Sequence, residues 1–285
     1  MKLCRFLDSQ NRVHTGVLSD DDKVLDLAPA EVSSITTLLE AADPLKRLAA
    51  IARSPLPRLD LSEVRLLSPV ERQEIWAVGV TYLRSKSARM EESDFSASAY
   101  DRVYDAERPE LFFKALPEKV IGPGDSVGIR GDATWSVPEP ELALVLNSRG
   151  TLVGFTIGND MSSRDIEGEN LLYLPQAKVY DRSCAIGPCI LIGRTEEEAR
   201  QWAIHLRIRR AGEEVFSGKT SVGQIKRSFD ELRQFTCRSQ TFPHGVVLLT
   251  GTGIVPADDF TLEAGDTVRI TIDGIGTLEN PVVRV

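Results

Sequence analysis

The stretch Trp135–Asp165, WSVPEPELALVLNSRGTLVGFTIGNDMSSRD, sets the organisation of the chain. It opens with two carboxylates, Glu139 and Glu141, that alternate with Pro138 and Pro140. Proline at these positions excludes a helix and favours an extended segment. Residues two apart in an extended segment lie on one face, so we expect both glutamates to point the same way.

A β-hairpin is predicted after the glutamates, because an apolar run, a turn-forming NSRG and a second apolar run follow one another. With the turn centred on Ser148 and Arg149, Asp160 falls opposite Val137 and diagonal to Glu139. Val137 and both glutamates have the same parity in the sequence. Asp160 therefore joins the two glutamates on one face of the hairpin.

Three carboxylates on one face repel one another unless a cation lies among them. Because these ligands offer only oxygen, we expect a hard divalent cation, Mg²⁺ first, with Mn²⁺ and Ca²⁺ as alternatives. An E-x-E pattern alone is more often a solvated strand face, with the aspartate capping the next helix. The hairpin geometry and the residues that follow it favour the metal site.

Several motifs in the same order resemble the core of the fumarylacetoacetate hydrolase superfamily. That core reads E-x-E-L-A, then N-D-x-S-x-R-D, G-K-S-x-D and G-P, and this chain carries GFTIGNDMSSRDIE followed by AKVYDRSCAIGP. The matching residues are Glu139, Glu141, Asn159, Asp160, Ser162, Arg164, Asp165, Lys178, Asp181 and Pro188. The resemblance covers most of the chain from Ile75 onward. It implies a divalent metal held by Glu139, Glu141 and Asp160, with Lys178 beside the site.

The predicted fold class is α+β and strand-rich: a mixed β-roll of the kind this family shows, with a small N-terminal α+β domain. Residues 2–27 alternate apolar stretches with turn clusters and predict an antiparallel meander. A helical stretch follows over 34–53, interrupted near Pro44. The proline-rich SPLPRLDLS predicts a joint between a small domain, 1–68, and a catalytic domain, 69–285. We interpret the first domain as a lid or packing module.

The junction after the apolar segment IWAVGV departs from the family's hydrolases. In those enzymes it reads G-x-N-Y-x-x-H-x-x-E, and its histidine and glutamate activate the hydrolytic water. This chain keeps Gly79 and Tyr82, but Ser85 and Ala88 stand in the positions of the dyad. Neither serine nor alanine acts as a general base near neutral pH, which argues against a hydrolase.

The chain also resembles the subgroup that dehydrates 2-keto-3-deoxy sugar acids, through Y-x-x-S-K-x-A-R-M-E-E and R-P-E-L-F-F-K-A. In that subgroup the glutamate of P-E-L-F-F-K lies at the active site, which makes Glu110 a catalytic candidate. The resemblance implies dehydration of 2-keto-3-deoxy arabinonate or xylonate to 2-oxoglutarate semialdehyde, through a metal-stabilised enolate, in oxidative pentose catabolism. We expect Lys178 to be the base and Glu110 the acid, although the two roles could be exchanged.

Five residues are expected to bind the substrate or to orient the catalytic pair: Tyr82, Ser85, Arg164, Asp181 and Thr252. Arg164, in a helix predicted over 162–172, would pair with a substrate carboxylate. A salt bridge within its own helix explains this arginine equally well. Asp181 would orient either the loop or Lys178, which we place in an extended segment. Thr252 offers a hydroxyl to a carboxylate.

Three other functions stay open. An acylpyruvate hydrolase or an oxaloacetate decarboxylase of the same superfamily would keep the metal enolate but cleave a carbon–carbon bond, and the decarboxylase needs less base chemistry. Lys178 would alternatively form a Schiff base with the keto group, without a metal. A metal-stabilised binding or scaffold protein would bind a 2-oxo acid without turnover.

Composition restricts the partners and the compartment. The net charge of −8 and the lack of long basic runs argue against nucleic acid and anionic membranes. No apolar segment has the length of a signal peptide or membrane span, and the four cysteines form no C-x-x-C pair. We therefore expect a cytoplasmic enzyme acting on a small 2-oxo sugar acid. The family resemblance implies homodimers or homotetramers.

Overall fold

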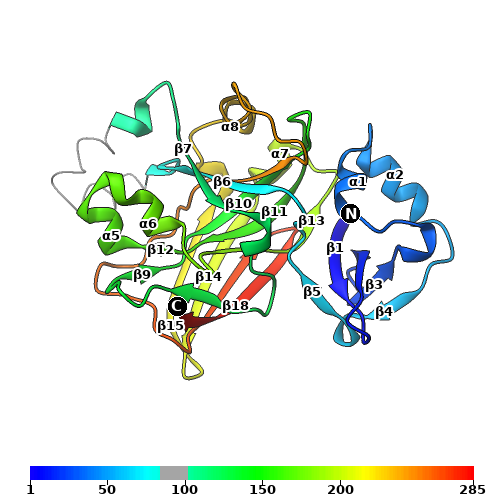
Figure 1. Ribbon diagram of the computed structural model, residues 1–285, viewed down its shortest axis with the longest axis horizontal. Coiled ribbons are helices and arrows are strands. Elements are labelled where there is room, and N and C mark those ends of the chain that lie inside the picture. Colours follow the sequence, from blue (N-terminus) through cyan, green and yellow to red (C-terminus); the bar gives the residue numbers. More distant parts are fainter. Residues whose placement is uncertain (84–101) are drawn as a thin grey trace.

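The computed structural model describes residues 1–83 and 102–285. A small N-terminal part lies at one end of the molecule, and a larger strand-rich body forms the rest (Figure 1). Within the described residues, no helix is both long enough and apolar enough to cross a membrane. Ser85 and Ala88, the residues that replace the hydrolase dyad, lie outside the described residues.

The N-terminal part confirms the predicted meander and the interrupted helix. Its elements are β1 Lys2–Leu7, β2 Val13–Leu18, β3 Lys23–Asp26, α1 Ile35–Leu39, α2 Pro44–Ile51, β4 Arg58–Asp60 and β5 Arg65–Leu67. Ser34 and Asp43 accept hydrogen bonds at the starts of α1 and α2, which explains the interruption. Because β1 also pairs with β13, these strands continue the large sheet of the body. The domain boundary after residue 68 stays a prediction.

The body is built from two mixed sheets. The large sheet has the order β4-β3-β2-β1-β13-β11-β10-β16-β6-β7, and the small sheet has the order β15-β14-β17-β18-β8. The body strands of the large sheet are β6 Glu74–Gly79, β7 Glu110–Ala115, β10 Pro140–Leu146, β11 Leu152–Asp160, β13 Cys184–Leu191 and β16 Val246–Leu249. Those of the small sheet are β8 Val127–Ile129, β14 Ala203–Arg210, β15 Glu213–Ser221, β17 Thr267–Ile272 and β18 Gly276–Arg284. The pairs β6–β16 and β8–β18 are parallel, so the predicted strand-rich, mixed fold is confirmed.

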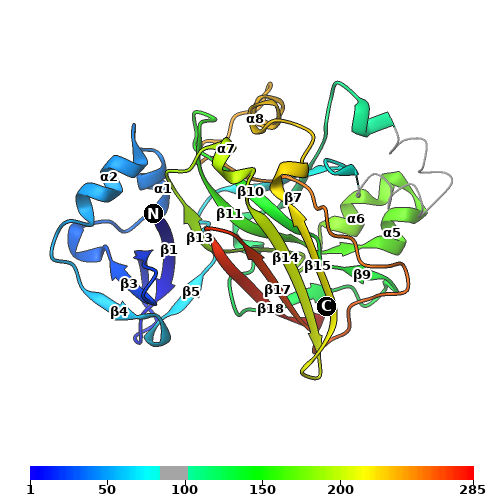
Figure 2. The same ribbon diagram turned by 180° about the vertical axis from the view of Figure 1, so that it is seen from behind.

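The two sheets pack face to face, and the main apolar core lies between them. Figure 2 shows β14, β15, β17 and β18 crossing in front of β10 and β11. Buried core residues from both sheets include Leu142, Leu144, Phe155, Ile157, Ile204, Leu206, Val268 and Ile270. Burial of each such side chain contributes roughly 1.5–3 kcal/mol. This core fixes the β10–β11 hairpin, whose open end carries the carboxylates.

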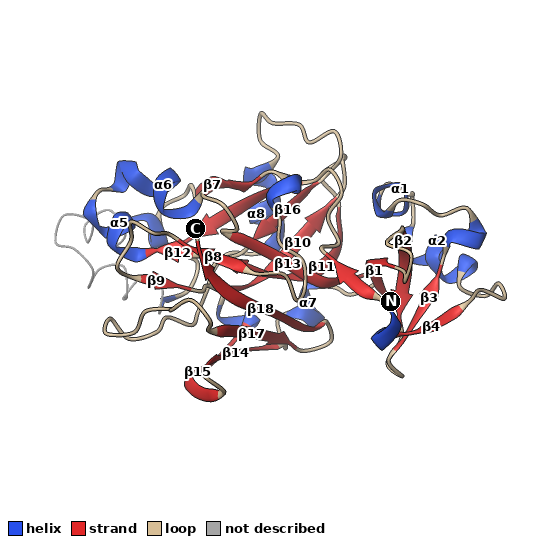
Figure 3. Ribbon diagram, turned by 60° about the horizontal axis from the view of Figure 1, so that its bottom comes forward, coloured by secondary structure: helices blue, strands red, loops and turns tan. Residues whose placement is uncertain are grey.

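Short helices cover the ends of the sheets (Figure 3). They are α5 Arg164–Glu169, α6 Leu174–Lys178, α7 Glu196–Ala199 and α8 Phe229–Thr236. The helix predicted over 162–172 is shorter, because residues 162 and 163 form strand β12, Ser162–Ser163, with β9, Ser136–Val137. Lys178 ends α6, so its predicted extended conformation is wrong. Pro175 lies in the first turn of α6, where its missing N–H disturbs no helical hydrogen bond.

The hairpin register differs from the predicted one by two residues. Glu141 pairs with Gly158, and the Asp160 N–H donates to the Glu139 carbonyl at 3.0 Å, so Asp160 lies opposite Glu139 and not Val137. One residue of the difference arises because Leu146 pairs with Leu152, which centres the loop on Arg149, and the other arises from the register shift between Val145 and Leu146. A shift of two keeps the parity, so the three carboxylates still share a face.

Candidate metal and active site

Glu139, Glu141 and Asp160 form a compact cluster at the open end of the hairpin. Each offers a carboxylate oxygen, and these oxygens lie within 4.8 Å of one another. Their exposed fractions are only 5%, 2% and 1%. Buried oxygen ligands at this spacing are the donor set of a hard divalent cation, so the residues present fit the expected metal.

Cations of the chain itself also approach the cluster. The Lys178 Nζ donates to Glu139 Oε2 at 2.6 Å, to Asp160 Oδ2 at 3.1 Å and to Ser162 Oγ at 2.6 Å. The Arg164 Nη1 donates to Glu139 Oε1 at 3.1 Å. On the other side, the Lys114 Nζ forms an ion pair with Asp160 Oδ1. Glu139 and Asp160 are thus each held from both sides.

Glu141 has a different environment. Among the described residues no lysine or arginine pairs with it, and its Oε2 accepts the Gly251 N–H at 2.5 Å. Burial raises the pKa of Glu141 well above its ordinary value, and the charges of Asp160 and Glu139 raise it further. Gly251 has φ +88°, and a Cβ there would lie 2.2 Å from Thr81 Oγ1. Only glycine therefore brings its N–H to Glu141.

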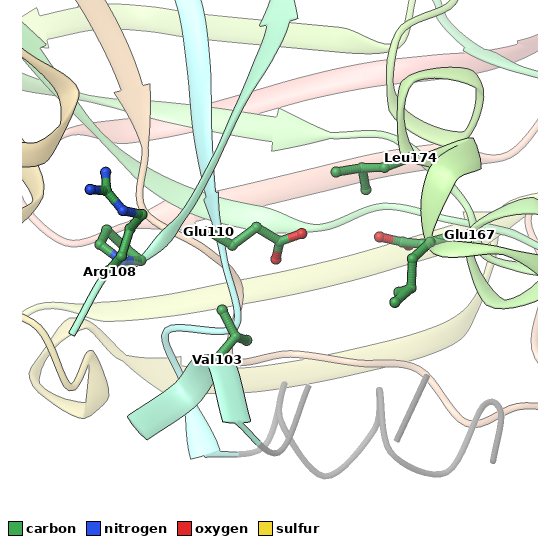
Figure 4. Close-up of a pocket in the computed structure, with 7 residues that line it drawn as sticks. Val103, Arg108, Glu110, Glu167 and Leu174 are labelled. Atoms are coloured by element: carbon green, nitrogen blue, oxygen red, sulfur yellow. The ribbon is translucent and has the colours of Figure 1, made fainter. Parts of the chain in front are cut away.

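The carboxylates line an inner cavity that adjoins a wider outer pocket. The inner cavity is lined by Val78, Gly79, Val80, Glu110, Phe112, Glu139, Glu141, Asp160, Glu167, Lys178, Gly251 and Thr252. The outer pocket, of about 380 Å³, is lined by Val103, Arg108, Pro109, Glu110, Glu167, Leu171 and Leu174. Glu110 and Glu167 belong to both, and Figure 4 shows their carboxylates pointing toward each other across the pocket. They mark the boundary between the two spaces.

Gly79 determines where the Glu110 side chain lies. The two residues pair across β6 and β7. A Cβ at Gly79 would lie 1.9 Å from Glu110 Oε2, so the carboxylate passes directly over the glycine. Any larger residue at this position would displace Glu110 from the boundary of the inner cavity.

The other predicted site residues have mixed locations. Thr252 lines the inner cavity, and its hydroxyl bonds the backbone of Ile254. Tyr82 is fully buried beside Gly253 and lines neither space, and its hydroxyl has no hydrogen-bond partner among the described residues. Ser85 is outside the described residues.

The predictions for Arg164 and Asp181 have different outcomes. Arg164 is buried and pairs with Glu139, with Glu167 Oε2 4.0 Å away, so an intrahelical ion pair is present and a second partner adds to it. Asp181 is 76% exposed at its side chain and pairs with Lys119 at 3.2 Å. The expected contact between Asp181 and Lys178 is not formed in the described part of the chain.

Sequence reasoning missed Lys114 and Glu167. Lys114 lies inside β7 with no exposed surface. The register of β6 and β7 shifts beside Lys114, which pairs with no residue of β6, so strand alternation does not predict its orientation. Glu167 follows Arg164 by three residues on α5, so the two share a helix face.

The chain is similar to proteins that are named as sugar-acid dehydratases. It is 46% identical over 280 residues to a Haloferax volcanii protein named "Probable 2-keto-3-deoxyxylonate dehydratase", with 94% of each chain covered. It is 40% identical over 235 residues to a Saccharolobus solfataricus protein named 2-dehydro-3-deoxy-D-arabinonate dehydratase, covering 81% of this chain and 79% of the relative.

A solved structure agrees with these relatives. It is described as 2-keto-3-deoxy-D-arabinonate dehydratase complexed with magnesium and 2,5-dioxopentanoate, and it matches with a TM-score of 0.84 and 33% identity over 100% of this chain and 99% of the other. The family profile described as "Fumarylacetoacetate (FAA) hydrolase C-terminal" matches residues 74–283. The chain belongs to the fumarylacetoacetate hydrolase family.

Proposed function

We propose that this chain is a Mg²⁺-dependent dehydratase of a 2-keto-3-deoxy pentonate, arabinonate or xylonate. The product would be 2-oxoglutarate semialdehyde, which is 2,5-dioxopentanoate, formed in oxidative pentose catabolism. The observation that carries the proposal is the buried cluster of three carboxylates with Lys178 and Glu110 beside it. The names of the two relatives and of the solved structure support the substrate class.

Glu139, Glu141 and Asp160 would hold the metal, for which Mn²⁺ and Ca²⁺ are alternatives. A bound Mg²⁺ would polarise the keto oxygen and stabilise the negative charge that develops there. The carboxylates themselves are held by Lys114, Lys178, Arg164 and the Gly251 N–H. The protein therefore supplies oriented ligands in a space with little access to water.

Dehydration removes a proton from C3 and the hydroxyl from C4, which leaves as water once it has received a proton. Tautomerisation of the resulting unsaturated 2-oxo acid moves two hydrogens from the C5 hydroxymethyl group to C3 and C4. Lys178 and Glu110 both line the inner cavity, so either can reach these positions. We assign Lys178 as base and Glu110 as acid, with exchange of the two roles left open.

The remaining residues would bind the substrate. Thr252 offers its hydroxyl to the inner cavity, and Arg164, which already bridges Glu139 and Glu167, would position a substrate carboxylate or the ligand glutamate. Ser85, which lies outside the described residues, stays a predicted substrate-binding residue. The outer pocket would accept the C4–C5 end, where Glu110 and Glu167 present hydrogen-bond acceptors to hydroxyl groups.

The first test is an assay of Mg²⁺-loaded protein with 2-keto-3-deoxy xylonate and 2-keto-3-deoxy arabinonate, coupled to an aldehyde dehydrogenase. We expect semialdehyde formation that disappears with a chelator and in Glu139→Ala. Pyruvate release from acylpyruvates or oxaloacetate, without semialdehyde, would replace the proposal by the hydrolase or decarboxylase function. Borohydride trapping of substrate on Lys178, together with activity in chelator, would indicate the Schiff-base mechanism.

A further inference from the structure

Lys114 is a buried cation that the proposed mechanism does not use. Its side chain has no exposed surface and leaves β7 toward the ends of β11 and α6. The Nζ donates to the Met161 carbonyl at 3.0 Å and to the Lys178 carbonyl, and it forms an ion pair with Asp160 Oδ1. An ammonium group has three N–H donors, and Lys114 directs its contacts to three separate oxygens.

One of these oxygens belongs to the proposed metal ligand Asp160, and the other two are backbone carbonyls of Met161 and Lys178 beside it. Asp160 divides its carboxylate between two lysines, with Oδ1 toward Lys114 and Oδ2 accepting from Lys178 at 3.1 Å. The Lys178 carbonyl lies at the last residue of α6, where carbonyls lack partners within the helix. Lys114 thus joins three chain segments: β7, the end of β11 and the end of α6.

We propose that Lys114 is a positioning residue of the metal centre, which orients Asp160 for ligation and holds the backbone of Lys178 beside it. The proposal rests on the proposed metal site but not on the identity of the substrate. It goes beyond that function because it assigns the ordering of the site to a side chain that does not itself line the inner cavity and that contacts the metal ligand Asp160.

Two effects of Lys114 on metal affinity oppose each other. A partner that orients a ligating carboxylate is typically worth about 10- to 100-fold in metal affinity. A positive charge near a divalent cation lowers the affinity through repulsion. We expect orientation to dominate, because the charge of Lys114 is already compensated by Asp160 and by two carbonyl oxygens that are not among the metal ligands.

The test is the affinity for Mg²⁺ without substrate, measured by isothermal titration calorimetry. Lys114→Met keeps an unbranched side chain that is one atom shorter but removes the charge and the donors, and it should bind Mg²⁺ about 10- to 100-fold more weakly. The matched control is Lys119→Met, which removes a positive charge from an exposed lysine paired with Asp181 and should not change the affinity. Unchanged or tighter Mg²⁺ binding by folded Lys114→Met overturns the proposal.

Lys114→Gln serves where the methionine variant does not fold, since the amide keeps two N–H donors without the charge. Its Mg²⁺ affinity should also fall, and excess Mg²⁺ should restore most of the turnover. An affinity equal to that of the wild type overturns the proposal. The dehydratase function and this inference can fail separately. If no semialdehyde forms but the Lys114 variants bind Mg²⁺ more weakly as expected, only the function is rejected. A wild-type protein that binds no Mg²⁺ rejects both.

Discussion

Glu141→Gln should weaken metal binding without destabilising the metal-free fold. Glu141 is buried, accepts the Gly251 N–H and has no paired lysine or arginine in residues 1–83 and 102–285. Glutamine has the same shape and keeps a carbonyl oxygen for that N–H. The variant thus loses a buried charge without losing the hydrogen bond, so the metal-free variant should be at least as stable as the wild type at pH 7.

The pH dependence gives the sign and the size of this effect. The folded state holds the proton of Glu141 more tightly than the unfolded chain, because burial and the neighbouring carboxylates raise its pKa. The contribution of this group to stability is therefore fully present below its ordinary pKa of 4.5, and it is lost as the pH rises through the raised folded value. Between those two values, each pH unit should widen the stability gap between variant and wild type by up to about 1.4 kcal/mol.

Magnesium should reverse the order of stability. At a concentration of 100 times Kd, the ligand stabilises the wild type by about 2.7 kcal/mol, whereas the variant has lost a ligand and should gain little. The assay is urea unfolding in chelator and in Mg²⁺ from pH 5 to 8, with the exposed Glu197→Gln as control. Two results would refute the reasoning: a metal-free variant that is clearly less stable than the wild type at pH 7, or a variant that keeps the full Mg²⁺ effect.

Other substitutions test the catalytic assignments. Lys178→Met should lower kcat by about 10²- to 10⁴-fold, measured in the semialdehyde assay, because it removes a proton-transfer group. Glu110→Gln should cause a loss of the same order, whereas the exposed Glu118→Gln should leave kcat unchanged; equal effects would reject the role of Glu110. Gly79→Ala should displace the Glu110 carboxylate and lower kcat/KM by about 10²-fold, with the Mg²⁺ affinity retained as the check that the metal site is intact. Chelator should abolish turnover but leave a cooperative unfolding transition in circular dichroism, since the chain supplies its own cations to the carboxylates.

The shared face of the three carboxylates was predictable from the sequence, because it depends only on the alternation of side chains along the two strands of the hairpin. Alternation along β10 and β11 decides which side chains share a face, and a shift by two residues leaves that result unchanged. The shift itself depends on the length of the loop, in which Gly150 has φ +69°, and on an irregularity beside that loop. Turn composition predicts that a turn occurs at such a place, but it does not determine the number of residues in the loop.

Sequence patterns did not predict the helix that carries Lys178 or the burial of Lys114. The helix α6 has five residues, which is too short for apolar periodicity to distinguish it from an extended segment. A lysine next to an apolar run is usually exposed, and only the packing of β7 against the ends of β11 and α6 shows that Lys114 is buried. These contacts join residues far apart in the sequence, so no local pattern contains them.

The charges of the site explain why we expect the chain to fold without a bound metal. The repulsion among three carboxylates predicts a cation among them, and the described part of the chain provides three: Lys114, Lys178 and Arg164. In the described part of the chain they bond directly to Glu139 and Asp160, whereas Glu141 accepts the Gly251 N–H and feels the charge of Lys178 without a direct contact. The fold therefore needs no metal to compensate two of the carboxylates, unlike a structural zinc site whose ligands order only with the ion. Glu141 has the least direct compensation by cations, so we expect its neutralisation to weaken metal binding at little cost to folding.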